Sequence, residues 1–426
     1  MSSRPSYRAL LAVPSLPRVI VSMQLARLAQ AMVGIALVLF TLQAYGSPAL
    51  AGVVTFAGIF PGLLVSPIAG ALLDRHGRIR LVALDYLVAL SSLVLIGGLS
   101  AAGALPAPLL VAITVVSSLT GILSATGLRS LFPILVPRPL WERANAVDSN
   151  GYVIATILGP PVAAALVAFA GPQAALLLIA IPFGLAVIAI IGVHEPRTET
   201  SSSGRLFADA WAGLRYTLRN PTLRGLGLSI TVANLTSGMT TIVIPVIVIR
   251  ELGYSDAVVG LAYAVSGLSG LVSTFFFGRF DTRGREWGML VIPMLLFAPP
   301  AALLWPASGA LGPIAPAAGL ALIVVGQFLF GLINGPLDIA LFTLRQRRTD
   351  QAMLGRAFAV SMAFNFMGFP VGSAVTGVII GTSVVWAIGF GVVAAVVSAV
   401  LAAFLIPRRD PDESDEPGEA VVATPA

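Results

Sequence analysis

Long apolar runs alternate with short polar segments along the whole chain. Twelve runs are long enough to cross a bilayer, because a spanning helix needs about 20 apolar residues at ~1.5 Å rise per residue. They extend over approximately 18–44, 48–73, 81–103, 107–132, 147–170, 173–193, 222–249, 255–277, 287–308, 316–343, 356–381 and 384–406. The runs are too continuously apolar for the alternating ~10-residue strands of an outer-membrane barrel. The pattern predicts an all-α membrane protein with twelve transmembrane helices.

Composition supports this reading and excludes several functions. Hydrophobic residues make up 57% of the 426 residues and charged residues only 10%, and the mean hydropathy is +0.94. Cysteine and lysine are absent, which excludes disulfides, thiolate metal sites and a lysine-containing phosphate loop. The two histidines, His76 and His194, are too far apart in sequence to suggest a metal-ligand pair. We therefore expect no metal, no cofactor and no enzymatic nucleophile–base arrangement.

The arginines are distributed unevenly over the gaps between the runs. All 25 basic residues are arginine, and 23 of them lie in the N-terminal segment or in and beside every second gap. The intervening gaps contain one arginine, Arg250. Because positive residues mark cytoplasmic loops, both termini are predicted to be cytoplasmic in a multi-pass protein of the bacterial cytoplasmic membrane. Anionic lipid, and no nucleic acid, then accounts for the pI of about 10.3.

Two stretches of the sequence repeat at nearly the same spacing. The pattern Asp-x-x-Gly-Arg occurs at 74–78 and 281–285, and Arg-Ala-x-Ala-Val occurs at 143–147 and 356–360. Many secondary transporters consist of two similar halves. The sequence therefore predicts a six-helix half over 1–193 and a second over 222–409.

A polar segment, 194–221, joins the two predicted halves. Within it, Phe207, Trp211, Leu214 and Leu218 recur at helical spacing among arginines, which predicts an amphipathic helix on the cytoplasmic face. This segment is either a tether between the halves or a regulatory element. The acidic tail, 410–426, has few large apolar residues and is predicted to be disordered.

Two motifs carry a resemblance to a known family. The stretch Gly70-Ala-Leu-Leu-Asp-Arg-His-Gly-Arg78 resembles the loop signature between helices 2 and 3 of the major facilitator superfamily. The segment 127–137, followed by Arg143-Ala-Asn145, resembles the bacterial branch of enterobactin exporters and macrolide-efflux proteins. The resemblance implies proton-driven efflux of amphipathic drug-like or siderophore-like molecules by alternating access, in a protein expected to be monomeric.

The same resemblance assigns a gate. In similar transporters the motif aspartate latches the cytoplasmic side against the opposite half through a charge–dipole contact, worth roughly 0.3–1 kcal/mol and up to about 2 when partly buried. The gating set comprises Gly70, Asp74, Arg75, Gly77 and Arg78, with the second copy Asp281, Gly284 and Arg285. The alternative is a solvated turn without a gating role.

The fifth predicted helix contains a run of small residues around a proline. Ala155, Gly159 and Pro160 resemble the antiporter signature of the superfamily, with alanine at several of its glycine positions. Small residues four apart let helices approach closely, and proline bends the segment. The motif favours an antiporter, although helix packing explains the same residues.

Polar residues inside apolar runs suggest a substrate cavity, because burying them in lipid is costly. The first, seventh and tenth runs contribute the candidates Arg27, Gln30, Asn234, Ser237, Asn334 and Asp338. Arg27 is expected to hold an anionic group of the cargo, and Asp338 to bind and release the coupling proton. Alternatively, Arg27 forms a structural ion pair with Asp148 or Asp338, and Asp338 pairs with Arg345 or Arg129.

Carboxylates are scarce in the first half. Asp85 and Asp148 both lie near the predicted cytoplasmic ends of their runs, so no acid is expected at the middle of a first-half helix. Proton-coupled members of the resembled family often carry one there. The first half therefore gives no sequence support for proton coupling. The alternative function is import or facilitated diffusion of a small metabolite, which Arg27 would favour if the cargo is anionic. A membrane scaffold or sensor that does not transport is a more distant one.

Overall fold

The structure is a computed structural model that describes residues 6–195, 206–280, 282, 284–350 and 353–408. Within these residues the chain folds into helices joined by turns. The predicted disordered tail, 410–426, lies outside the described residues.

Twelve helical spans in the described residues are long and apolar enough to cross a membrane, which confirms the predicted fold class. The first six are α2 (Leu16–Tyr45), α3 with α4 (Pro48–Ala57 and Phe60–His76), α5 (Arg78–Ala101), α6 (Ala107–Leu135), α7 (Trp141–Ala170) and α8 (Pro172–Ile190). The last six are α10 (Pro221–Val246), α11 (Asp256–Phe277), α12 to α14 (Glu286–Leu296, Ala298–Ala302 and Leu304–Ala307), α15 (Pro316–Arg347), α16 (Leu354–Ile380) and α17 (Val384–Leu405). The short elements are α1 (Tyr7–Leu11), η1 (Arg138–Leu140), α9 (Leu206–Arg219) and η2 (Ile247–Glu251).

Proline explains both where several helices begin and where the ninth span is broken. Pro48, Pro172 and Pro316 each occupy the first helical position, where the missing N–H costs nothing and φ already suits a helix. Inside a helix, proline removes a hydrogen bond and bends the chain. Pro293 lies inside α12, and Pro299 follows at the start of α13, so the ninth span is divided into three short helices.

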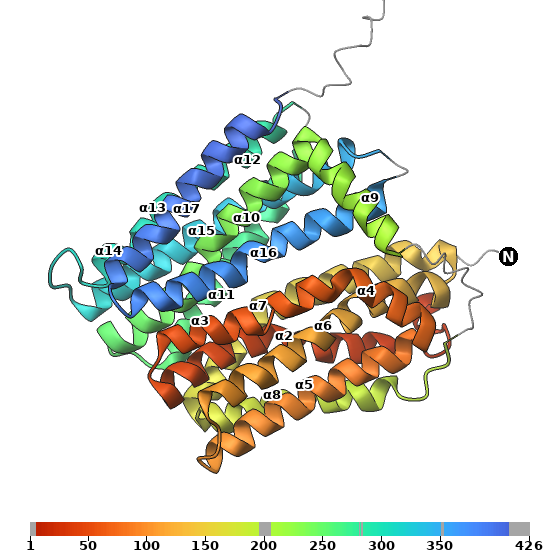
Figure 1. Cartoon of the computed structure of the whole chain (residues 1–426), viewed down its shortest axis with the longest axis horizontal. Helices are drawn as coiled ribbons and strands as arrows, with labels where there is room; N and C mark the ends of the chain where they lie inside the picture. The colour runs from red at the N-terminus through yellow and green to blue at the C-terminus, as the bar shows by residue number, and fades with distance from the viewer. Residues whose placement is uncertain (1–5, 196–205, 281, 283, 351–352, 409–426) are drawn as a thin grey trace, which may run out of the picture.

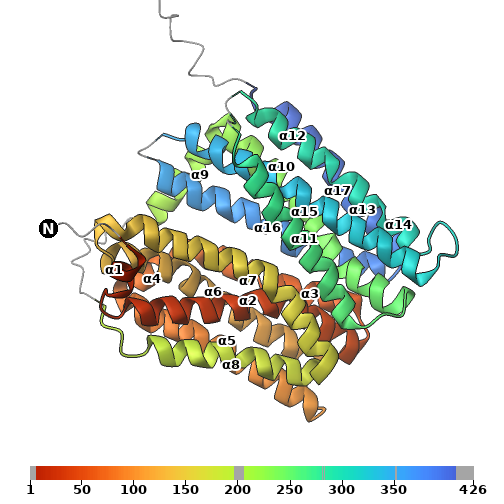
Figure 2. The same ribbon diagram turned by 180° about the vertical axis from the view of Figure 1, so that it is seen from behind.

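The six-helix groups form two halves that lie side by side (Figures 1 and 2). In the first half α2 packs between α7 and α8, and α5 packs between α6 and α8. In the second half α10 packs between α16 and α17, and α11 packs against α15. The end of the molecule that carries α9 is called the linker end here, and the opposite end, with the turn at Gly46, is called the far end (Figure 1).

The two halves are tightly packed near the far end. A Cβ atom at Gly377 of α16 would lie 2.7 Å from the backbone oxygen of Pro48, and one at Gly260 of α11 would lie 2.9 Å from Cα of Pro161. Only glycine permits such close approach, and small residues are what membrane helices use for it. The far-end interface is thus built from backbone-to-backbone contacts.

Two hydrogen bonds reinforce the far-end interface. The Gln43 amide donates to a carboxylate oxygen of Asp256 at 2.7 Å, and the Arg250 guanidinium donates to the Gly46 carbonyl at 2.8 Å. Each bond joins the first half to the second. Together with the glycine contacts, they close the molecule at this end.

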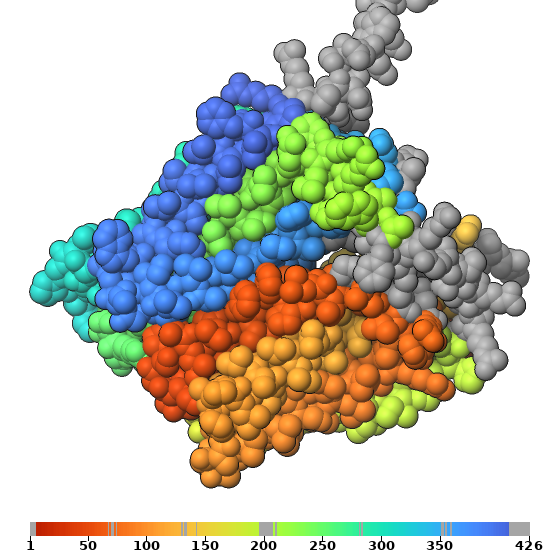
Figure 3. Space-filling model, in the orientation of Figure 1, coloured from red at the N-terminus to blue at the C-terminus, as the bar shows by residue number. Residues whose placement is uncertain are grey.

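At the linker end, α9 lies beside both halves. It packs against α16 of the second half and α4 of the first, and Figure 3 shows a narrow gap between α16 and α4 close to it. Its C-terminal part is tied to the second half, because the Asp350 N–H donates to the Tyr216 hydroxyl at 3.0 Å and the Asn220 amide donates to the Arg348 carbonyl at 2.9 Å. A helix is thus present within the predicted linker, 194–221.

Candidate functional site

A cavity of about 520 Å³ lies mainly within the first half. Five of its walls come from α2, α3, α4, α5 and α6, and single residues of α7 and α8 complete the first-half lining. The second half contributes Thr241 of α10, Tyr263 of α11 and Phe369 of α16. The cavity is therefore a pocket of one half that the other half covers.

The cavity wall is mostly aliphatic, with hydroxyl groups and one carboxyl group set into it. Among its lining residues the polar side chains are Gln30, Thr55, Asp85, Ser92, Thr114, Ser117, Ser118, Thr241 and Tyr263. Small-molecule sites are commonly 300–1,000 Å³ and largely apolar with a few orienting polar groups. The cavity thus has the size and chemistry of a site for an amphipathic small molecule.

Asp85 of α5 is a buried carboxyl group in the cavity wall. The residue is 2% exposed, and its Oδ2 atom has no hydrogen-bond partner. Thr120 and Ser124 of α6 lie beside the carboxyl group, and Ser124 accepts a hydrogen bond from the Gln30 amide at 3.2 Å. A membrane-embedded carboxyl group of this kind marks a functional site by default.

Asp85 lies in the third of α5 nearest the linker end, and the sequence did not indicate that it lines a cavity. It is the eighth residue of α5, about 10 Å along the helix axis from Arg78 at 1.5 Å per residue. The helix is more charged at its beginning, where Arg78 and Arg80 lie, and entirely uncharged after Asp85. A single charged residue in an otherwise apolar part of the helix was the sequence signal for a functional residue. Only the packing of α6 against α5 shows that Asp85 lines a cavity.

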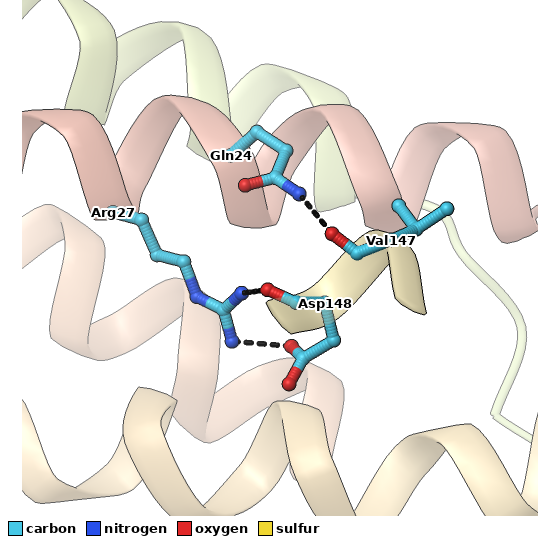
Figure 4. Close-up of polar contacts among 4 residues, drawn as sticks. All are labelled: Gln24, Arg27, Val147 and Asp148. Carbon is cyan, nitrogen blue, oxygen red and sulfur yellow. Dashed lines mark hydrogen bonds and ion pairs between the residues drawn. The ribbon is translucent and has the colours of Figure 1, made fainter. Parts of the chain in front are cut away.

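Arg27 of α2 is paired with Asp148 of α7 (Figure 4). Its guanidinium donates one hydrogen bond to the Asp148 carboxylate and a second, at 2.7 Å, to the Asp148 carbonyl. One turn earlier, the Gln24 amide donates to the Val147 carbonyl at 3.1 Å. Arg27 does not line the cavity. The structure therefore shows the alternative in which Arg27 forms an ion pair with Asp148.

The other predicted cavity residues lie elsewhere in the second half. The Asn234 amide donates to the Asn365 carbonyl at 2.6 Å, joining α10 to α16, and the Asn334 amide donates to the Phe330 carbonyl of its own helix at 3.1 Å. The Ser237 carbonyl accepts the Thr241 hydroxyl at 3.0 Å. Asp338 is exposed on α15. Of the six predicted residues only Gln30 lines the cavity, and α15 contributes none of the lining residues.

The predicted gating motif lies at the linker end, where α4 meets α5. Gly70 and Asp74 belong to α4, and Arg75 is exposed in its last turn. Gly77 then separates the two helices with φ of 90°, a left-handed conformation that favours glycine. The equivalent glycine of the repeat, Gly284, has φ of 73°. Both copies of the motif thus have a glycine with positive φ at the same position.

Arg78 begins α5 and binds Glu195 at the start of the linker. Its guanidinium lies 3.1 Å from Glu195 Oε1, and Glu195 Oε2 accepts the Ile79 N–H at 3.1 Å. Glu195 therefore satisfies one of the free N–H groups at the start of α5. In the second copy Arg285 directly precedes α12, whereas Asp281 lies outside the described residues.

The small-residue motif of α7 serves both packing and the cavity. Ala155 is 5% exposed, and a Cβ atom at Gly159 would lie 2.5 Å from the Ala31 Cβ atom of α2. Pro160, the next residue, lines the cavity. The predicted close helix approach is present.

Among the described residues, twelve helices long enough to span a membrane, in two similar halves with a cavity in the first that the second covers, are the architecture of a multi-pass membrane transporter. The sequence profile of the Major Facilitator Superfamily matches residues 19–234 and 226–425. The chain belongs to this superfamily.

Similar proteins agree with this assignment. The chain is 36% identical over 382 residues to y4rN of Sinorhizobium fredii, described as an uncharacterized MFS-type transporter, and the match covers 89% of this chain and 92% of that one. Two solved structures share the fold at 13% identity and cover 91% of this chain. They are the nucleoside transporter NupG (TM-score 0.68, 96% of its chain) and the xylose transporter XylE from E. coli in an inward-open conformation (TM-score 0.67, 96% of its chain).

Proposed function

We propose that the protein exports amphipathic, drug-like or siderophore-like small molecules across the bacterial cytoplasmic membrane by alternating access, driven by the proton gradient. The observation that carries this proposal is the cavity of about 520 Å³ in the first half, covered by three residues of the second. A site covered in this way opens when the halves rock against each other, which is how transporters of this architecture work.

The side to which the cavity opens is inferred from charge and packing together. The arginine distribution assigns the linker end to the cytoplasm. The far end, with the bonds from Gln43 to Asp256 and from Arg250 to Gly46, would then be the closed outer side. In this conformation the cavity would exchange its contents with the cytoplasm. The direction itself is inferred from the small-residue motif of α7, which resembles the antiporter signature and favours export.

The chemistry of the cavity favours amphipathic cargo over an anionic metabolite. Aliphatic side chains form most of its wall, and no arginine is among the lining residues. Arg27, the residue that import of an anion would use, already holds the Asp148 carboxylate. For the coupling proton we retain Asp338 as a candidate and add Asp85, which is the carboxyl group of the cavity itself.

The proposed cavity can be tested with substitutions that place a larger side chain in it and leave the fold intact. Gly34 of α2 and Gly121 of α6 line the cavity, and a Cβ atom at either position would meet no atom within 4 Å. Gly34→Leu and Gly121→Leu therefore place a side chain in empty space, and the change from glycine also favours the helix by up to about 1 kcal/mol. Gly98→Leu is the matched control, because Gly98 is exposed on α5, also has no atom near its Cβ position, and lies outside the cavity.

Transport is measured as accumulation of fluorescent amphipathic dyes in an efflux-deficient host, and then as pH-gradient-driven flux in proteoliposomes. The wild type and Gly98→Leu are expected to lower accumulation, and both cavity variants are expected to lose at least nine-tenths of that effect. A protonophore should abolish it. Equal accumulation with and without the wild-type protein would contradict export, and full activity of Gly34→Leu and Gly121→Leu would contradict the assigned cavity.

A further inference from the structure

We propose that Asp85 is the anchor for a positively charged group of the cargo, so that the cavity takes lipophilic cations, such as protonated amines, in exchange for a proton. The inference rests on the proposed function in one respect, namely that the cavity is a cargo site. It goes further by naming the charge of the cargo and the residue that recognises it.

The first argument is the position of the carboxyl group. Asp85 is 98% removed from solvent, belongs to the cavity wall, and has an Oδ2 atom without a hydrogen-bond partner. Buried polar atoms are normally satisfied, and a buried carboxylate needs a counter-charge. Its neighbours Thr120 and Ser124 carry only hydroxyl groups. Within the described residues, no counter-ion therefore occupies the Oδ2 side of the carboxyl group, and because this atom is itself buried, a cation in the cavity would reach it after a rotation of the Asp85 side chain.

The charged residues on the helices around Asp85 are either paired with each other or lie at the linker end. Arg27 on α2 is committed to Asp148 on α7, so this pair is neutral overall. The helix α8 contains no ionisable residue, and the one ionisable residue of α6, Arg129, lies in the last two turns near the linker end. The charged residues of α4, and Arg78 and Arg80 of α5, likewise lie at the linker end. When Asp85 is ionised, the cavity therefore carries one negative charge in excess.

Aromatic rings line the same cavity as the carboxyl group. Phe183 of α8, Tyr263 of α11 and Phe369 of α16 line the cavity together with Asp85. Aromatic faces attract cations within about 6 Å, and more strongly where water is excluded. A carboxylate combined with aromatic and aliphatic groups suits an organic cation, whereas a small inorganic cation would require several oxygen ligands around it.

The exchange balances in charge and protons. The neutral Asp85 carboxylic acid releases its proton to solvent when a cation enters, and the resulting carboxylate forms an ion pair with that cation. When a proton returns to the carboxylate, the ion pair is lost and the cation leaves. Cargo and proton therefore compete for one carboxyl group, which couples export of the cation to entry of a proton.

The experiment measures binding and proton release at equilibrium, without transport. Purified full-length protein in an uncharged detergent and weak buffer is titrated at pH 6–8 with tetraphenylphosphonium, a permanent lipophilic cation. Tetraphenylborate is the anion of the same shape. The wild type is expected to bind the cation at least tenfold more tightly than the anion and to release up to one proton for each cation bound.

Three variants assign the effect to a residue. Asp85→Asn is expected to bind tetraphenylphosphonium at least tenfold more weakly and to release no proton, while Asp85→Glu retains both properties. Asp338→Asn, at the other candidate for the coupling proton on α15, tests whether the proton is released there instead. Gel filtration and the melting temperature establish that each variant is folded.

Several results would overturn the proposal. These are unchanged cation binding by Asp85→Asn, loss of proton release in Asp338→Asn instead, and failure of the wild type to bind the cation or to release protons. The wild-type measurement carries the test alone if the variants do not fold. Proton-linked binding without flux in proteoliposomes would refute the proposed export but not this site. Flux that is unchanged in Asp85→Asn would refute this site but not the proposed export.

Discussion

Arg27 of α2 holds Asp148 of α7 by two hydrogen bonds, one to the carboxylate and one to the backbone carbonyl (Figure 4). The Arg27 side chain is 13% exposed and the Asp148 side chain 15%. Because neither group is well hydrated, each depends on the other for its counter-charge. The pair therefore fixes α2 against α7 within the first half.

Removing one partner of this pair should destabilise the protein. Asp148→Ala leaves the Arg27 guanidinium without its carboxylate, and breaking a buried pair costs about 3–5 kcal/mol, with the lower end expected here because both groups keep some exposure. Thermal unfolding in detergent is expected to show a clearly lowered melting temperature. The charge-reversed double variant, Arg27→Asp with Asp148→Arg, should recover part of the loss, whereas an unchanged melting temperature in Asp148→Ala would contradict a structural role.

The gating motif predicts unequal effects in its two copies. Asp74→Asn should lower transport while leaving the protein in the membrane, because the amide keeps the size of the side chain and loses most of the charge–dipole interaction. Asp281→Asn should have a smaller effect. Turnover in proteoliposomes and the amount of protein in the membrane are the two measurements. Equal turnover of the wild type and Asp74→Asn would exclude the latch.

The far-end contact offers a test of alternating access. The chain has no cysteine, so Gln43→Cys with Asp256→Cys gives a single pair whose native side chains are 2.7 Å apart. A short bis-maleimide crosslinker should join the two cysteines, hold the far end closed and abolish transport. Each single-cysteine variant should keep transport after the same treatment. Efficient crosslinking with full transport would show that this contact does not open during the cycle.

Membrane orientation can be measured directly. The arginine distribution predicts that 1–17, 74–80, 133–146, 194–221, 279–286, 344–355 and 407–426 face the cytoplasm. Alkaline phosphatase fused after Arg348 should therefore be inactive, and a fusion within the 309–315 turn should be active. The reverse pattern would mean that the linker end lies outside.

The fold was predictable because its determinants are local in sequence. A run of apolar residues long enough to span the bilayer can satisfy its backbone only as a helix, and Pro172 and Pro316 mark helix starts within a residue or two of the predicted ones. The repeat was equally visible, since Gly77 and Gly284 occupy the same position of the motif and both have a positive φ.

The site was less predictable, because it depends on which faces of distant helices meet. Asn234 is as polar and as deep in its run as Gln30, yet it bonds to the Asn365 carbonyl while Gln30 lines the cavity. Arg27 has a partner 121 positions away, and the sequence offered two carboxylates for it. Asp85 needed the packed structure to show that one of its oxygens is unsatisfied.

The cavity is carried almost entirely by one half, and three residues of the other half cover it. Bound cargo would therefore travel with the first half while the second half swings past it. Cargo specificity would then depend on residues of the first half. The rate of cargo release would depend on the second half. Evolution could exchange one of these traits without altering the other.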